Sequence, residues 1–274
     1  MIEAQPNEQE PVDRFFDAAA GYWYDVYGRK DLQGRIYRER LGAVADWTRA
    51  LALTPGAAVL DAGCGAGLMT IELAGGGFTV TGTDSSAEMV RSTRRLAAER
   101  GLADRITVTE ADAHRLPFPD GAFELVVALG LLPWLHDAQG GVTELARVLA
   151  PGGWLILTAD NRLRLNRMLE PRENPLLSGL RPLKRALRPP PDPSEGAQAH
   201  RHGPQEVDAM LARAGLTVGR RATIGYGPFT ILGRPALPDE AGTWLHTRLD
   251  GLAGRHPRLR SSGWHYLVQS RRDA

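Results

Sequence analysis

The 274-residue chain contains only one cysteine, Cys64, so no disulfide bond can form within it. Since extracellular proteins often depend on disulfides, we expect a cytoplasmic protein. The chain also lacks any run of about twenty apolar residues, which a membrane-spanning helix requires. Its first residues, MIEAQPNEQEPVD, are polar and acidic and do not resemble a signal peptide.

An excess of charge of one sign is also lacking, because Lys and Arg total 33 and Asp and Glu total 32. Proteins whose main partner is nucleic acid usually carry a basic face, so we expect no nucleic-acid partner. The length suits one enlarged α/β domain better than two domains.

The most informative stretch is VLDAGCGAG, at residues 59–67. An apolar run ends at Asp61, breaks into three alternating glycines and leads into a helix-forming segment at 68–73. This pattern predicts a strand, a tight turn and a helix start, where backbone comes close to a ligand and free N–H groups face it. About twenty residues later, Asp84 follows a second strand, where its carboxylate can accept hydrogen bonds from ribose hydroxyls.

The glycine spacing distinguishes between nucleotide ligands. A dinucleotide site has G-x-G-x-x-G, whereas here the glycines alternate and Asp61 would repel a pyrophosphate. The D-x-G-x-G-x-G pattern resembles motif I of class I S-adenosylmethionine-dependent methyltransferases, of the small-molecule type similar to methyltransferase domains 11 and 25. The resemblance implies S-adenosylmethionine as cofactor, with Asp61 toward its methionine part and Gly63, Cys64 and Gly65 close to it. For Cys64 we expect a small residue under a tight turn, not a nucleophile.

Three later segments continue the resemblance. Residues 111–118 are similar to the family's D-A-x-x-L-P-F segment, and 123–129 form a short apolar run typical of a strand covered on both faces. Residues 144–153 are similar to its R-V-L-K-P-G-G helix and turn. The resemblance covers residues 59–158.

The resemblance also implies the rest of the cofactor site. Ser85 and Met89 occupy positions that line the adenosine pocket, although simple helix–sheet packing is an alternative for Met89. Asp112 stands where the family's acid takes the adenine amino group, and Ala113 follows it. Leu129, at the end of its apolar run, completes the predicted cofactor-binding residues.

The implied fold is a three-layer, doubly wound Rossmann-like α/β fold. It has a mostly parallel seven-stranded sheet with a reversed last strand, N-terminal helices and an inserted lid. We expect a disordered tail at 1–13 and a single methyltransferase domain at 14–274. Within the domain, the expected parts are a helical cap at 14–55, a cofactor-binding core at 56–159, a lid insertion at 160–204, and a C-terminal helix and strands at 205–274.

For the methyl acceptor we expect an apolar wall at Trp134, which follows a strand. Tyr24 and Tyr27 are candidates for a lid that contacts the substrate, with packing on the sheet as the alternative.

No catalytic base stands out. His136, His200 and His202 are weak candidates, and the family pattern L-x-H-V-x-D places Trp134, not His136, at its histidine. We expect no metal.

The predicted function is transfer of a methyl group to an O, N or C atom of a small hydrophobic metabolite, in secondary or lipid-like metabolism. No Asn-Pro-Pro-Tyr run, typical of enzymes that methylate planar amino groups in nucleic acid or protein, follows the strand at 123–129. Two alternatives stay open: a non-catalytic cofactor-binding partner subunit, or a methyltransferase acting on a membrane-associated lipid, for which the basic, apolar segment 181–188 is the reason. The oligomeric state, monomer or homodimer, is also open.

Overall fold

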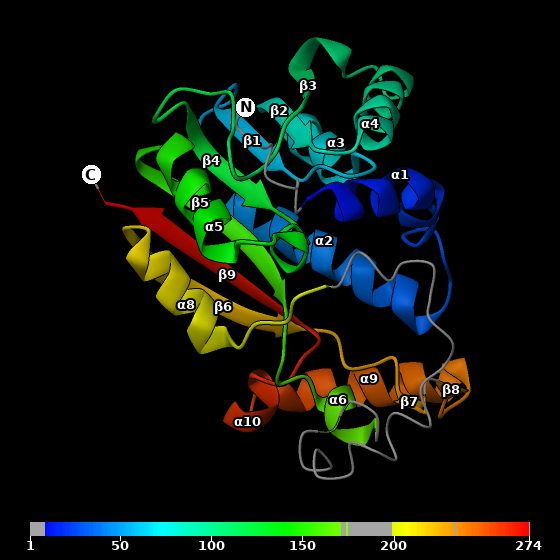
Figure 1. Cartoon of the computed structure of the whole chain (residues 1–274). Coiled ribbons are helices and arrows are strands. Elements are labelled where there is room, and N and C mark those ends of the chain that lie inside the picture. Colours follow the sequence, from blue (N-terminus) through cyan, green and yellow to red (C-terminus); the bar gives the residue numbers. More distant parts are fainter. Residues whose placement is uncertain (1–8, 171–173, 175–198, 233, 274) are drawn as a thin grey trace, which may run out of the picture.

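The computed structural model describes residues 9–170, 174, 199–232 and 234–273 (Figure 1). Residues 1–8 of the predicted tail and most of the predicted lid insertion, including 181–188, lie outside the described residues. Within the described part of the chain, no helix is long and apolar enough to cross a membrane.

The described residues form a seven-stranded sheet with the strand order β3-β2-β1-β4-β5-β9-β6. Neighbours among β1 to β5 run parallel, whereas β9 runs antiparallel to both β5 and β6. This confirms the predicted sheet with its reversed last strand. The strands are β1 (Ala58–Ala62), β2 (Thr79–Asp84), β3 (Ile106–Glu110), β4 (Phe123–Ala128), β5 (Leu149–Asp160), β6 (Leu216–Ile224) and β9 (His265–Arg272).

Helices cover both faces of the sheet (Figure 1). Alternation along β4 shows why: Leu125 and Val127 pack into the core beneath α2 and α3, whereas Val126 and Ala128 pack into the core beneath α5 and α8. A strand buried on both faces therefore reads as one continuous apolar run. The helices are α1 (Glu10–Asp25), α2 (Leu32–Ala50), α3 (Leu68–Gly75), α4 (Ala87–Glu99), α5 (Ala138–Val148), α6 (Leu165–Leu169), α8 (Pro204–Arg213), α9 (Asp239–Ala253) and α10 (Pro257–Arg260).

Helix α1 begins at Glu10, so residues 10–13 of the predicted disordered tail at 1–13 are helical. It is fastened to the start of α4. Asp17 accepts hydrogen bonds from the Ser86 hydroxyl (2.5 Å) and the Glu88 amide (3.3 Å), and Asp13 accepts one from the Ser85 hydroxyl (2.6 Å). The tertiary contacts that order this segment come from residues about seventy positions away, so local composition gave no sign of them.

The two ends of the predicted insertion lie together. Asn161 and His202 form an isolated β-bridge, the Arg162 amide donates to the His202 carbonyl (3.1 Å), and the His202 amide donates to the Asp160 carbonyl (3.0 Å). The backbone at 202 is therefore joined to the chain at 160–162, where β5 ends, and α6 follows. Short elements complete the described chain: η1 (Ala103–Arg105), η2 (Leu132–Trp134), β7 (Thr230–Ile231) and β8 (Arg234–Pro235).

Candidate functional site

The glycine turn after β1 brings backbone and side chains into close contact. Gly63 has φ +69°, and a Cβ there would lie 2.9 Å from Leu131 Cδ1. Gly67 has φ +88° and a Cβ would lie 2.8 Å from Thr93 Oγ1. Positive φ and this lack of space both require glycine. The turn thus leads directly into α3 at the carboxyl edge of the sheet.

Asp61, the last residue but one of β1, is a buried carboxylate with only one of its two oxygens hydrogen-bonded. It is 1% exposed, and its Oδ2 accepts a hydrogen bond from the Thr70 hydroxyl at 2.6 Å. Its Oδ1 is buried and has no partner. Burial, together with the charge of Asp84, raises the pKa of Asp61 to about 7. An unpaired buried carboxylate is costly, so this oxygen fits a cationic ligand group.

Arg40 brings the opposite charge into the same pocket. This residue of α2 is 5% exposed, and its Nη2 donates to the Tyr27 hydroxyl at 3.0 Å. Its guanidinium carbon lies 4.6 Å from the centre of the Tyr37 ring, and its Nε is buried without a partner. An arginine whose Nε has no partner and a carboxylate whose Oδ1 has none line the same pocket, and together they fit a ligand with an amino-acid end, which carries an ammonium and a carboxylate.

Arg40 was not among the predicted site residues, although the sequence carries a signal for it. Ile36, Arg40 and Val44 follow one another at helical spacing, and all three are buried. A charged residue in the middle of an apolar stripe indicates a buried charge that needs a partner.

Asp84 is held at the end of β2 by the glycine turn itself. Its Oδ2 accepts from the Gly65 amide at 2.9 Å and its Oδ1 from the Ser86 amide at 3.0 Å. Burial, and the charges of Asp13 and Asp17, raise the pKa of Asp84 to about 6 against the effect of these bonds. The fixed carboxylate suits a pair of neighbouring ligand hydroxyls.

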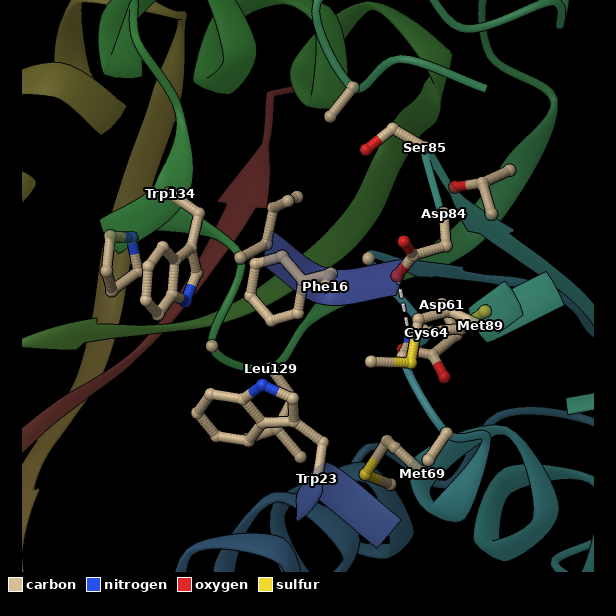
Figure 2. Close-up of a pocket in the computed structure, with 18 of the residues that line it drawn as sticks. Phe16, Trp23, Asp61, Cys64, Met69, Asp84, Ser85, Met89, Leu129 and Trp134 are labelled. Carbon is tan, nitrogen blue, oxygen red and sulfur yellow. Dashed lines mark hydrogen bonds between the residues drawn. The ribbon is translucent and has the colours of Figure 1, made fainter. Parts of the chain in front are cut away.

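One pocket collects every residue predicted to bind the cofactor, and Figure 2 labels Asp61, Cys64, Asp84, Ser85, Met89 and Leu129 among them. The full set is Asp61, Gly63, Cys64, Gly65, Asp84, Ser85, Met89, Asp112, Ala113 and Leu129.

Cys64 is buried, and its amide donates to the Thr83 carbonyl at 2.8 Å. Burial, with the charges of Asp84 and Asp61, raises the pKa of its thiol well above the usual value. A thiol with a raised pKa is a poor nucleophile, so this agrees with the prediction of a small residue under a tight turn.

Aromatic rings form the other wall of the pocket. Figure 2 shows Phe16, Trp23 and Trp134 facing the carboxylate side of the cavity. The Phe16 and Trp134 ring centres are 4.9 Å apart in an edge-to-face arrangement, and those of Trp23 and Trp134 are 6.4 Å apart. Phe15 stacks on the outside of Trp134 at 5.5 Å. Trp134 was predicted for this wall, but the two α1 residues were not.

Of the remaining predicted residues, the substrate and catalytic candidates, only some line the pocket. Tyr27 lines the pocket, whereas Tyr24 is 44% exposed and is not among the described residues that line it. The three histidine candidates also lie outside its described lining. His136 is exposed and its Nδ1 lies 3.3 Å from Gln9 Oε1. The His200 amide donates to the Pro133 carbonyl. The His202 amide donates to the Asp160 carbonyl, and the His202 carbonyl accepts from the Arg162 amide.

Asp160, at the end of β5, is a pocket carboxylate that the sequence analysis did not single out. Its Oδ1 lies 3.2 Å from Nδ1 of the buried His265. Burial alone would raise the pKa of Asp160, but the bond with His265 and the charges of His265, Arg40 and Arg164 lower it below its usual value. The carboxylate is therefore ionised at neutral pH. Across the described residues, no cluster of three or more His, Cys, Asp or Glu is placed to hold a metal.

The sheet order with a reversed last strand, the glycine turn and the two strand-end carboxylates together define the class I S-adenosylmethionine-dependent methyltransferase fold. Comparison with known proteins agrees, because residues 60–157 match the family model described as "Methyltransferase domain". Residues 60–157 of this chain therefore match a methyltransferase domain, within a sheet that has this fold.

Similar proteins include a ubiquinone biosynthesis O-methyltransferase of Pectobacterium carotovorum, 32% identical over 157 residues, which cover 57% of this chain and 64% of that protein. A probable chloroplastic tocopherol O-methyltransferase of Oryza sativa is 31% identical over 62% of this chain and 51% of its own length. The match thus spans less than two thirds of either relative.

Among solved structures, magnesium protoporphyrin IX methyltransferase from Synechocystis with bound S-adenosylhomocysteine superposes with a TM-score of 0.66. It is 21% identical, with 97% of this chain and all of that chain covered. A [4+2]-cyclase superposes with a TM-score of 0.64 and 20% identity, covering all of this chain and 98% of that chain. These structures support the fold.

Proposed function

We propose that the protein is an enzyme that transfers the methyl group of S-adenosylmethionine to an oxygen, nitrogen or carbon atom of a small hydrophobic acceptor. The observation that carries the proposal is one pocket with two unlike linings. The buried charged groups Asp61 and Arg40, together with Asp84, fit the cofactor, and the aromatic wall at Trp134 fits an apolar acceptor.

Four side chains would hold the cofactor. Asp61 pairs with its ammonium, Arg40 with its carboxylate, Asp84 with the ribose hydroxyls and Asp112 with the adenine amino group. S-adenosylmethionine supplies a methyl group that its sulfonium charge already activates, and it leaves as S-adenosylhomocysteine. The protein's own task is to align the acceptor and to exclude water from it.

The acceptor would lie against Phe16, Trp23 and Trp134, whose rings offer a planar, apolar surface. When the acceptor atom is a hydroxyl oxygen, its proton must leave as the new bond forms. We assign this proton to the carboxylate of Asp160, in place of the three predicted histidines, because it is ionised, lines the pocket and has one oxygen fixed by His265.

The proposal extends to location and partners. We propose a cytoplasmic enzyme with no nucleic-acid partner. The reduced, buried Cys64 and the nearly balanced charge of the chain support this.

The test is binding followed by turnover. Calorimetry should show that the purified protein binds S-adenosylmethionine, and mass spectrometry should detect S-adenosylhomocysteine when hydroxylated aromatics, quinols or aromatic amines are added. Asp160→Asn should bind the cofactor normally yet lose turnover of hydroxyl acceptors, and Tyr24→Ala, outside the pocket, is the matched control. Absence of cofactor binding would contradict the proposal, and binding without turnover of any acceptor would contradict its enzymatic part.

A further inference from the structure

His114 lies just outside the pocket lining and engages Asp112, which lines it. One carboxylate oxygen, Asp112 Oδ1, takes two hydrogen bonds from this one residue. The His114 amide donates at 2.9 Å, and ring Nδ1 lies 2.7 Å away. Both bonds therefore fix the rotation of a side chain that is otherwise 44% exposed.

The ring of His114 is itself fixed. Its side chain is 14% exposed, and its ring centre lies 4.0 Å from that of His136. His136 is in turn 3.3 Å from the side-chain oxygen of Gln9, which lines the same pocket. A carboxylate only accepts, so Nδ1 must carry a hydrogen.

The charges of the pair agree with this geometry. The hydrogen bond with His114 is the main cause that lowers the pKa of Asp112. The same bond is the main cause that raises the pKa of His114, against the effect of burial. Asp112 is thus kept ionised, with Oδ1 occupied and Oδ2 left for a ligand donor.

We propose that His114 is a positioning residue for the adenine end of the cofactor: it orients Asp112 so that the free carboxylate oxygen accepts the purine 6-amino group. This inference rests on the proposed function. His114 would thereby favour adenine over purines that lack the 6-amino group, although His114 does not itself line the pocket. Without His114, Asp112 would rotate and be solvated, and each binding event would have to order it again.

The experiment measures binding of S-adenosylhomocysteine by calorimetry. His114→Ala should weaken binding about three- to tenfold, the range for one oriented hydrogen bond. His114→Asn, whose amide N–H can reach the same oxygen, should recover most of the loss. His256→Ala, at an exposed histidine elsewhere, is the control and should leave the affinity unchanged.

Two further measurements separate positioning from a merely structural role. In a double-mutant cycle, adding His114→Ala to Asp112→Ala should cause no further loss, because His114 acts through Asp112. An S-adenosylhomocysteine analogue with hydrogen in place of the 6-amino group should bind the wild type and His114→Ala equally.

An equal loss for the analogue, or additive losses in the cycle, would overturn the inference. So would an unchanged affinity in His114→Ala. If the wild type binds no S-adenosylhomocysteine, both the proposed function and the role of His114 are contradicted. If the wild type binds it and His114→Ala binds equally well, only the role of His114 is contradicted.

Discussion

Replacing Asp61 by Asn should stabilise the unliganded protein while abolishing tight cofactor binding. Since the pKa of Asp61 is about 7 against an ordinary 3.8, ionising it at pH 8 costs the folded protein about 4 kcal/mol. Asn removes this cost and can still accept the hydrogen bond from the Thr70 hydroxyl. Its buried amide N–H₂ then lacks a partner, at a cost of about 1–3 kcal/mol. We expect a net gain of about 1–3 kcal/mol in the free energy of unfolding at pH 8.

The gain should depend on pH in a fixed direction. The pKa in the folded protein lies above that in the unfolded chain, so protonated Asp61 contributes stability that is fully present below pH 3.8 and is lost as pH rises through about 7. The advantage of Asp61→Asn should therefore be larger at pH 8 than at pH 5, by about 2–3 kcal/mol. Urea denaturation of both proteins at the two pH values measures this difference.

Ligands complete the test. Saturating S-adenosylhomocysteine should stabilise the wild type much more than Asp61→Asn, because its ammonium is the partner that Asp61 lacks. 5′-Methylthioadenosine, which has no amino-acid end, should stabilise both proteins equally. A variant that gains the same stability at pH 5 and pH 8, or that binds S-adenosylhomocysteine as tightly as the wild type, would refute the reasoning.

Three further outcomes follow from the same site. Asp84→Ala should weaken S-adenosylmethionine binding by well over tenfold, measured by calorimetry on protein whose circular dichroism is unchanged, because a carboxylate bond pair to ribose contributes about 2–3 kcal/mol. Wild-type affinity should fall as pH drops through about 6, where Asp84 takes up a proton, and this step should be absent in Asp84→Ala. Arg40→Met should lose about tenfold or more in affinity for S-adenosylhomocysteine but little for 5′-methylthioadenosine, and equal losses for both ligands would show that Arg40 supports the fold instead.

Sequence and structure agree best where function depends on local backbone. The turn at 59–67 must be glycine-rich because its φ values and contacts exclude side chains, and strand-end acids follow it at fixed spacing. The ten predicted cofactor residues line one pocket for this reason, since the carboxyl ends of the parallel strands β1, β2, β3 and β4 meet at one edge of the sheet. The reversed last strand also followed from the resemblance to the family.

The sequence alone determined the strand, glycine turn and helix start at 59–73, because these depend on short-range patterns, and its resemblance to the family implied the sheet and the class of ligand. Only the tertiary structure decided which distant side chains complete the pocket. Arg40 reaches it from α2 and Phe16 from α1, and α1 is ordered by hydrogen bonds to Ser85 and Ser86. Contacts between residues so far apart in the chain leave no periodic signal. The three histidine candidates lie on loops outside the described pocket lining, whereas Asp160, at the end of β5, lines the pocket.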